Sequence, residues 1–216
     1  MCTTCRARWG APTSRCHRCA LEVPPGVATC GACLVAPPAW DAADAALAYE
    51  APWDRLVAAF KFDGALDLAP AFAELMAAAR DPSRPPPSWL VPVPLGPARL
   101  RERGYNQAWE LARRLARRLR VPADAHLLLR LRETPHQLAL PRTERAANVR
   151  GAFAIEPQRA AEVRGREVTI VDDVMTTGAT AAELARVLRA AGAARVDVWV
   201  LARTARPDAA DEGRAH

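Results

Sequence analysis

Apolar and polar residues follow two different periods along the chain, which predict strands and helices in turn. Short apolar runs predict strands at residues 45–49, 89–93, 127–131, 151–155, 168–171 and 196–201. Apolar residues at helical spacing predict helices over 53–60, 66–76, 107–120 and 180–191. This alternation favours an α/β domain of about five mainly parallel strands, with helices on both faces and a ligand at the carboxyl ends of the strands.

Three segments interrupt this pattern and predict irregular structure. Residues 81–88 (DPSRPPPS) are rich in proline and predict a surface loop. Residues 133–150 form a long, charged stretch with few apolar positions, which is typical of a mobile lid over a site. The polar residues 207–216 predict a disordered tail.

Length and charge bound the class of protein. With 216 residues, half of them hydrophobic, the chain can form one substantial α/β domain and a small appendage. It contains no apolar stretch of the roughly 20 residues that a membrane span needs, and its start does not resemble a signal peptide, so we expect a cytoplasmic protein. The net charge of +6 permits anionic partners, but Lys61 is the only lysine, so the arginine excess reflects compositional bias.

The first 33 residues contain all six cysteines, arranged as three C-x-x-C pairs. Two such pairs complete a tetrahedral zinc site, and disulfides are the weaker alternative in a chain without an export signal. We favour the second and third pairs because the turn Pro24-Pro25-Gly26 between them can bring them together. The sequence thus predicts a zinc-ribbon-like module at residues 1–38, with the ligands Cys16, Cys19, Cys30 and Cys33 and with Cys2 and Cys5 as a further half site.

The stretch 168–180, VTIVDDVMTTGAT, combines a strand end, a polar loop and the start of a helix. Backbone N–H groups and the positive end of a helix favour a phosphate here. Two carboxylates can accept hydrogen bonds from vicinal hydroxyls and can reach a magnesium ion. Together they predict a site for a ribose 5-phosphate, formed by Asp172, Asp173, Thr176, Thr177, Gly178, Ala179 and Thr180. The alternative is an acidic strand end in another doubly wound protein, such as a receiver or phosphatase domain.

Local spacing makes three further predictions around this site. Thr180 and Glu183 have the spacing of a capping box, which predicts that the helix begins at Thr180. The basic turn at 99–107 precedes another helix and predicts a second phosphate site, with Arg99 and Arg103 for a pyrophosphate. For Lys61 we prefer a solvated helix face to a role in ligand binding.

The predicted helix 107–120 carries arginines on the faces opposite its apolar stripe. Two interpretations are equally supported: a solvated basic face whose stems cover the sheet, or a nucleic-acid groove. The arginines concerned are Arg113, Arg114, Arg117, Arg118 and Arg120.

Residues 168–180 closely resemble the 5-phosphoribosyl-1-pyrophosphate (PRPP) loop of type I phosphoribosyltransferases. With the cysteine pairs, the strand end VPVPL and a third motif, they make the chain similar to the ComF (competence factor F) family from about Cys16 to Arg203. The third motif reads Arg132, Thr134, Gln137, Leu140, Arg142, Arg145, Asn148, Gly151 and Phe153. The resemblance implies a type I phosphoribosyltransferase-like domain at 39–206 that binds PRPP with magnesium, with Arg142 and Arg145 on a lid.

Three functions are compatible with this resemblance. The family name implies a role in DNA uptake, in which the domain binds PRPP and the protein contacts single-stranded DNA and other DNA-uptake proteins. The alternatives are an active phosphoribosyltransferase of nucleotide metabolism with an unidentified acceptor, and a regulator that senses PRPP. We expect PRPP binding with a role in DNA uptake; the acceptor, turnover and oligomeric state stay open.

Overall fold

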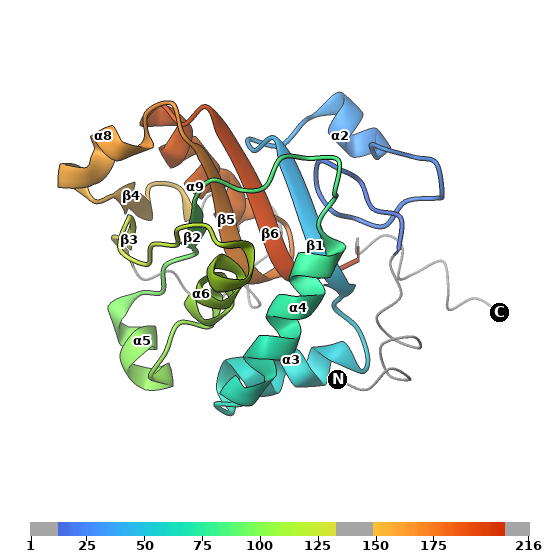
Figure 1. Cartoon of the computed structure of the whole chain (residues 1–216), viewed down its shortest axis with the longest axis horizontal. Coiled ribbons are helices and arrows are strands. Elements are labelled where there is room, and N and C mark those ends of the chain that lie inside the picture. The colour runs from blue at the N-terminus through green and yellow to red at the C-terminus, as the bar shows by residue number, and fades with distance from the viewer. Residues whose placement is uncertain (1–12, 133–148, 206–216) are drawn as a thin grey trace.

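The computed structural model describes residues 13–132 and 149–205 of the chain (Figure 1). Its helices and strands alternate as the periodicity predicts. The elements are α2 (Gly31–Val35), β1 (Ala42–Ala48), α3 (Trp53–Phe62), the 3-10 turn η1 (Leu66–Leu68), α4 (Ala69–Ala79), β2 (Leu90–Pro92), α5 (Pro97–Arg103), α6 (Gln107–Leu119), β3 (Leu128–Arg130), β4 (Phe153–Ile155), the 3-10 turn η3 (Pro157–Arg159), α8 (Ala160–Val163), β5 (Glu167–Met175), α9 (Ala179–Ala190) and β6 (Arg195–Arg203).

The central sheet has four parallel strands in the order β1-β6-β5-β2. Strand β5 is second from one edge, and its carboxyl end at Met175 pairs with Arg203 at the carboxyl end of β6. Because all four strands are parallel, their carboxyl ends meet at one edge of the sheet. This edge is where open α/β sheets bind ligands.

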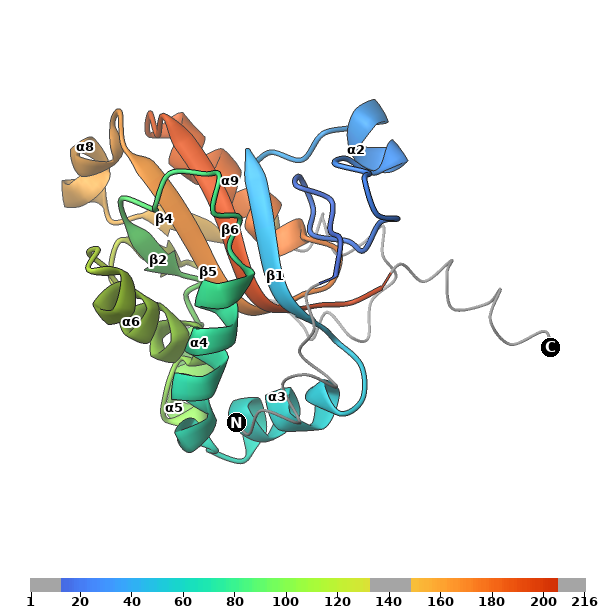
Figure 2. The same cartoon turned by 45° about the vertical axis from the view of Figure 1, so that its right-hand side comes forward.

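Helices cover both faces of the sheet, as predicted. Residues of β5 and β6 alternate between two cores: Ile170 and Val198 pack on the side of α9, whereas Val171 and Trp199 pack on the side of α3, α4 and α6. The two layers of helices are visible on either side of the sheet in Figures 1 and 2. This period of two follows from the geometry of a strand, in which successive side chains point to opposite faces.

The strands predicted at 127–131 and 151–155 do not extend the central sheet. They form β3 and β4, a separate antiparallel pair with Leu128 opposite Ile155. Both strands pack their buried residues against the α9 side of the core. The prediction of about five strands in one mainly parallel sheet is therefore corrected to four, because periodicity identifies a strand but not its partner.

The predicted lid and tail lie largely outside the described residues. The segment 133–148, with Arg142 and Arg145, connects the two strands of the β3-β4 pair, and the tail from residue 206 follows β6. The proline-rich segment 81–88 separates α4 from β2, as expected of a loop. Among the described helices α6 is the longest, with 13 residues, and the described part of the chain has no helix long and apolar enough to cross a bilayer.

The cysteine-containing segment lies beside β1, at the edge of the sheet (Figure 2). It has its own small core of cysteine and aliphatic residues, including Leu21. A short antiparallel bridge joins Arg15 to Glu22, and the backbone N–H of Ala43 in β1 donates to the carbonyl of His17 over 2.9 Å. Backbone hydrogen bonds therefore fix this segment, called here the cysteine knuckle (residues 13–35), to the sheet.

Candidate functional site

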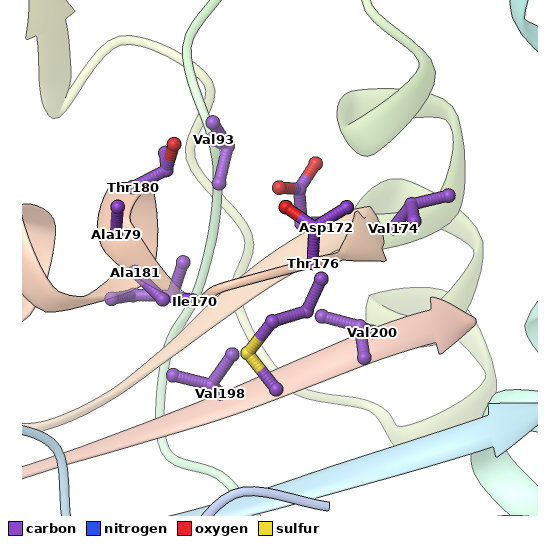
Figure 3. Close-up of a pocket in the computed structure, with 12 residues that line it drawn as sticks. Val93, Ile170, Asp172, Val174, Thr176, Ala179, Thr180, Ala181, Val198 and Val200 are labelled. Carbon is purple, nitrogen blue, oxygen red and sulfur yellow. The ribbon is translucent and has the colours of Figure 1, made fainter. Parts of the chain in front are cut away.

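The loop after β5 begins where the central sheet ends and leads directly into α9. Gly178 precedes the helix with φ +81°, a conformation that favours glycine. Thr176, Gly178 and Thr180 line a small hollow of about 30 Å³ together with Asp172 and Val93 (Figure 3). The start of α9 thus faces the same hollow as one of the two predicted carboxylates, the arrangement that a phosphate next to a diol requires.

The helix after the loop begins at Ala179, and its N-cap residue is Gly178, which has no side chain to cap it. The predicted capping box is wrong, because the N-cap position is Gly178 and Thr180 lies inside the helix, and the Glu183 side chain has other partners. Its carboxylate accepts a hydrogen bond from the backbone N–H of Gly151 over 2.6 Å and pairs with Arg186 over 2.7 Å. Glu183 therefore fixes the chain where it returns from residues 133–148, while at the start of α9 the Thr177 hydroxyl accepts a hydrogen bond from the Ala179 backbone N–H over 3.3 Å.

The two aspartates have different further partners, although their carboxylates contact each other. Asp172 lines the hollow on the α9 side, whereas Asp173 is 2% exposed and faces α3 and α6. There the Asp173 carboxylate pairs with Lys61 Nζ over 2.9 Å and accepts a hydrogen bond from Gln107 Nε2 over 3.4 Å. The structure thus places Asp172 next to the loop 176–180, called here the phosphate loop after its predicted ligand, and pairs Asp173 with residues of α3 and α6.

The prediction that Lys61 lies on a solvated face is wrong. Its side chain is 28% exposed and its ammonium group contacts the most buried carboxylate of the site. The sequence contains one signal for this role, since Lys61 is the only lysine among 30 basic residues.

Burial and mutual repulsion separate the pKa values of the two aspartates. Burial, with the neighbouring charge of Asp173, raises the pKa of Asp172 well above its usual value. Burial also acts to raise the pKa of Asp173, but the charge of Lys61 outweighs it, and the pKa is lowered. The ionised form is therefore favoured at Asp173 and disfavoured at Asp172, and a cation at the hollow would favour ionisation of Asp172.

The predicted basic turn is a helix, α5, which ends at Gly104 with φ +81°. Arg103 donates to the Gln107 side chain, which in turn donates to Asp173. The Gln107 side chain therefore links this arginine to the acid pair. Arg99 lies on the same helix. The start of α6 is capped by Asn106, whose side chain accepts from two backbone N–H groups, so any anion site here depends on arginine side chains and not on the helix end.

The basic face of α6 is partly neutralised within the helix. Arg113 and Arg114 both pair with the buried Glu110. Arg117 and Arg118 are exposed. The prediction of a basic surface therefore applies mainly to the last turn of the helix.

The four predicted cysteine ligands lie together. The sulfur atoms of Cys16, Cys19, Cys30 and Cys33 are all within 4.8 Å of one another, and those of Cys19 and Cys30 are 3.6 Å apart. Sulfurs around a tetrahedral zinc ion are about 3.8 Å apart, because Zn–S bonds are about 2.3 Å. The cluster could hold a metal ion, and Cys2 and Cys5 lie outside the described residues.

The thiols of this cluster differ in acidity. Burial raises the pKa of Cys19 to about 11. Burial also acts to raise the pKa of Cys16, but backbone N–H donors, first that of Cys30 at 3.3 Å, outweigh it and bring the pKa to about 7. N–H donors aimed at a sulfur stabilise thiolate, the form that binds a metal.

Two residues around the site were missed by sequence reasoning. Arg203, in the last strand, and Trp40, before β1, both touch the phosphate loop from the side of the cysteine knuckle. An arginine at the end of a strand and a tryptophan near prolines carry no motif. Their contacts depend on segments far apart in the chain, so the sequence held no signal for them.

Comparison with known proteins agrees with this geometry. A family model described as the phosphoribosyl transferase domain matches residues 106–216, which include the loop and the acid pair. The DNA utilization protein YhgH of Salmonella typhi is 36% identical over 209 residues, covering 94% of this chain and 90% of that protein. Competence protein F of Haemophilus influenzae is 35% identical over 193 residues (87% and 84%), and competence protein ComFC of Bacillus subtilis is 33% identical over 147 residues (67% and 57%).

The parallel sheet, the loop and the family match define a phosphoribosyltransferase-type domain with a cysteine knuckle beside it. Its relatives are curated as DNA utilization and competence proteins. The chain belongs to the ComF family of phosphoribosyltransferase-like proteins.

Proposed function

We propose that this chain binds PRPP with magnesium at residues 172–180 and acts in the uptake or use of DNA. The observation that supports the ligand is the hollow shared by Asp172 and the start of α9. The process is supported by the names of its relatives, which are called DNA utilization and competence proteins. The phosphoribosyltransferase fold supports the ligand but does not by itself require turnover.

Within the proposed site each group has a separate role. The loop Thr176–Thr180 binds the 5-phosphate through backbone N–H groups and hydroxyls. Asp172 accepts hydrogen bonds from the ribose diol, and Asp173 holds Lys61 as a cation near the site. Arg99 and Arg103, with Arg142 and Arg145 from the undescribed segment, bind the pyrophosphate.

Asp172 fits a role in holding magnesium. Magnesium prefers oxygen ligands and usually keeps several waters, so one carboxylate oxygen and the phosphates of a ligand suffice. When bound, the ion would offset the phosphate charge of PRPP. The raised pKa of Asp172 fits this role, because a cation at the hollow favours its ionised form.

We further propose that the cysteine knuckle binds zinc through Cys16, Cys19, Cys30 and Cys33, as a structural module of residues 1–38 in front of a domain at 39–206. The separate small core of the knuckle supports this division. We place the protein in the cytoplasm, where DNA arrives after uptake. Single-stranded DNA is proposed to contact the exposed Arg117 and Arg118.

Titration calorimetry with PRPP and magnesium tests the ligand. We expect Asp172→Asn to weaken binding by about 1.5–3 kcal/mol, roughly 10- to 150-fold, the scale of a hydrogen bond to a charged group. Asp67→Asn, an exposed acid on η1, is the matched control and should leave the affinity unchanged. Absence of PRPP binding to the zinc-loaded wild-type protein would contradict the proposal.

A further inference from the structure

Arg203 joins the cysteine knuckle to the phosphate loop. It stands at the carboxyl end of β6 and is only 7% exposed. Its Nε donates to the Cys19 carbonyl over 3.0 Å, and its Nη1 donates to the Met175 carbonyl over 2.9 Å and to the Thr176 carbonyl. A single planar guanidinium therefore contacts a predicted metal ligand on one side and the loop on the other.

Trp40 makes a second connection between the same two segments. Its indole N–H donates to the Arg18 carbonyl over 2.6 Å. The far edge of its ring lies against the loop, so close to Gly178 that an added Cβ there would be 2.8 Å from the Trp40 ring. The side chain is 5% exposed, so the surrounding core fixes its orientation.

Both connections begin in the same turn of the knuckle. The carbonyls of Arg18 and Cys19 lie within the stretch Cys16–Cys19, which supplies two of the four clustered sulfurs. A metal bound by four cysteines would fix this turn, because small cysteine modules have too little apolar core to fix it themselves. The knuckle core here consists of four buried residues, three of them the cysteines Cys16, Cys19 and Cys33.

Arg203 also helps to fix which way two loop amides point, together with the backbone N–H of Thr204, which donates to the Met175 carbonyl over 3.2 Å. In a trans peptide the carbonyl and the N–H point in opposite directions. Because the guanidinium holds the carbonyls of Met175 and Thr176, the N–H groups of Thr176 and Thr177 point away from Arg203. These are N–H groups of the loop that would bind a phosphate.

We propose that Arg203 and Trp40 are positioning residues that couple the metal-bound state of the cysteine knuckle to the shape of the phosphate loop. The coupling rests on the proposed zinc site but not on the proposed PRPP site, whereas its consequence for ligand affinity rests on both. Loss of the metal would free the Arg18–Cys19 turn. The loop would then lose two fixed contacts, and its amides would no longer be held in the orientation that binds a phosphate.

Hydrogen exchange of the full chain tests the coupling without any ligand. We expect the amides of residues 175–180 to exchange at least 10-fold faster after zinc is removed with a chelator. Arg203→Met, which keeps the volume but removes the donors, should give the same increase while retaining zinc. Removing zinc from the Arg203→Met protein should then increase the exchange of the loop amides little further, because the contact of Arg203 between the knuckle and the loop is already lost.

Controls separate this effect from general unfolding. Arg195→Met changes an arginine at the opposite end of the same strand, where it pairs with Asp197, and should leave exchange in the loop unchanged. Amide exchange of residues 168–171, which lie in β5 before the loop, should be the same in all samples. If Arg203→Met does not fold, Trp40→Phe replaces it, since it removes the N–H donor and shortens the ring.

PRPP affinity, measured on the same samples, distinguishes the two proposals. We expect at least a 10-fold loss of affinity in zinc-depleted wild type and in Arg203→Met. If wild type binds PRPP and neither zinc removal nor the variant changes loop exchange or affinity, the coupling is wrong. If loop exchange responds to zinc but wild type does not bind PRPP, the coupling stands and the proposed function fails.

Discussion

Replacing Asp173 and Asp172 one at a time by asparagine distinguishes the contributions of two neighbouring carboxylates to stability. Asp173 is 2% exposed and its charge is compensated by Lys61 at 2.9 Å. Asn keeps the shape but leaves the Lys61 ammonium without its carboxylate. Removing one partner of a buried ion pair costs about 3–5 kcal/mol of unfolding free energy.

Two features of the site place Asp173→Asn at the low end of this range. Lys61 is 28% exposed, so water partly solvates its charge. Asp172 also interacts with Lys61 and can ionise once Asp173 is neutral. We therefore expect a loss of about 3 kcal/mol, which lowers the melting temperature of a chain of this length by roughly 6–12 °C.

Asp172→Asn, the same substitution one residue earlier, is the control. Because the pKa of Asp172 is raised, its ionised form is disfavoured in the folded protein. Asn should therefore change stability by less than about 1 kcal/mol, the effect of a single neutral hydrogen bond, and can increase it. Thermal unfolding of both variants at pH 7 checks the prediction. An Asp173→Asn protein that melts within about 2 °C of wild type would refute the reasoning.

The pH dependence of the two variants should have opposite signs. The lowered pKa of Asp173 stabilises the fold above the ordinary carboxyl pKa of about 4, and this stability is lost as pH falls through the lowered value. The free energy of unfolding of Asp173→Asn should therefore approach that of wild type as the pH becomes acidic. The raised pKa of Asp172 stabilises the fold at pH below the ordinary carboxyl pKa, and this stability is lost as pH rises through the raised pKa. The stability of Asp172→Asn should therefore increase relative to that of wild type as pH rises.

Three further predictions concern other parts of the chain. Metal analysis should give about one zinc per chain, lost in Cys16→Ser and kept in Cys2→Ser; the reverse result would overturn the proposed ligand set. Gly178→Ala should destabilise the protein by at least about 1–2 kcal/mol, because φ is +81° and the indole edge is 2.8 Å from the added Cβ; an unchanged melting temperature would disagree. Affinity for single-stranded DNA should fall steeply with salt and weaken for all sequences in Arg117→Glu/Arg118→Glu, unless α6 is only a solvated face.

The fold class could be predicted because its signals are local. Each buried strand and each amphipathic helix has its own period in the sequence, and their alternation indicates a parallel sheet covered on both faces. The clustering of Cys16, Cys19, Cys30 and Cys33 was predictable for a similar reason, since C-x-x-C spacing brings two sulfurs together within one turn. The position of β3 and β4 outside the central sheet could not be predicted, because strand pairing is set by contacts between distant segments.

At the candidate site the sequence by itself determined the contiguous motif: a strand end, two acids, a loop and a helix start in one stretch, 168–180. Only the tertiary structure decided how each acid is used. Asp173 meets Lys61 from α3, and Arg203 meets Cys19 across 184 residues of chain. Periodicity shows which face of an element is buried, but partners from other elements are chosen by packing of the whole core, which no short stretch of sequence contains.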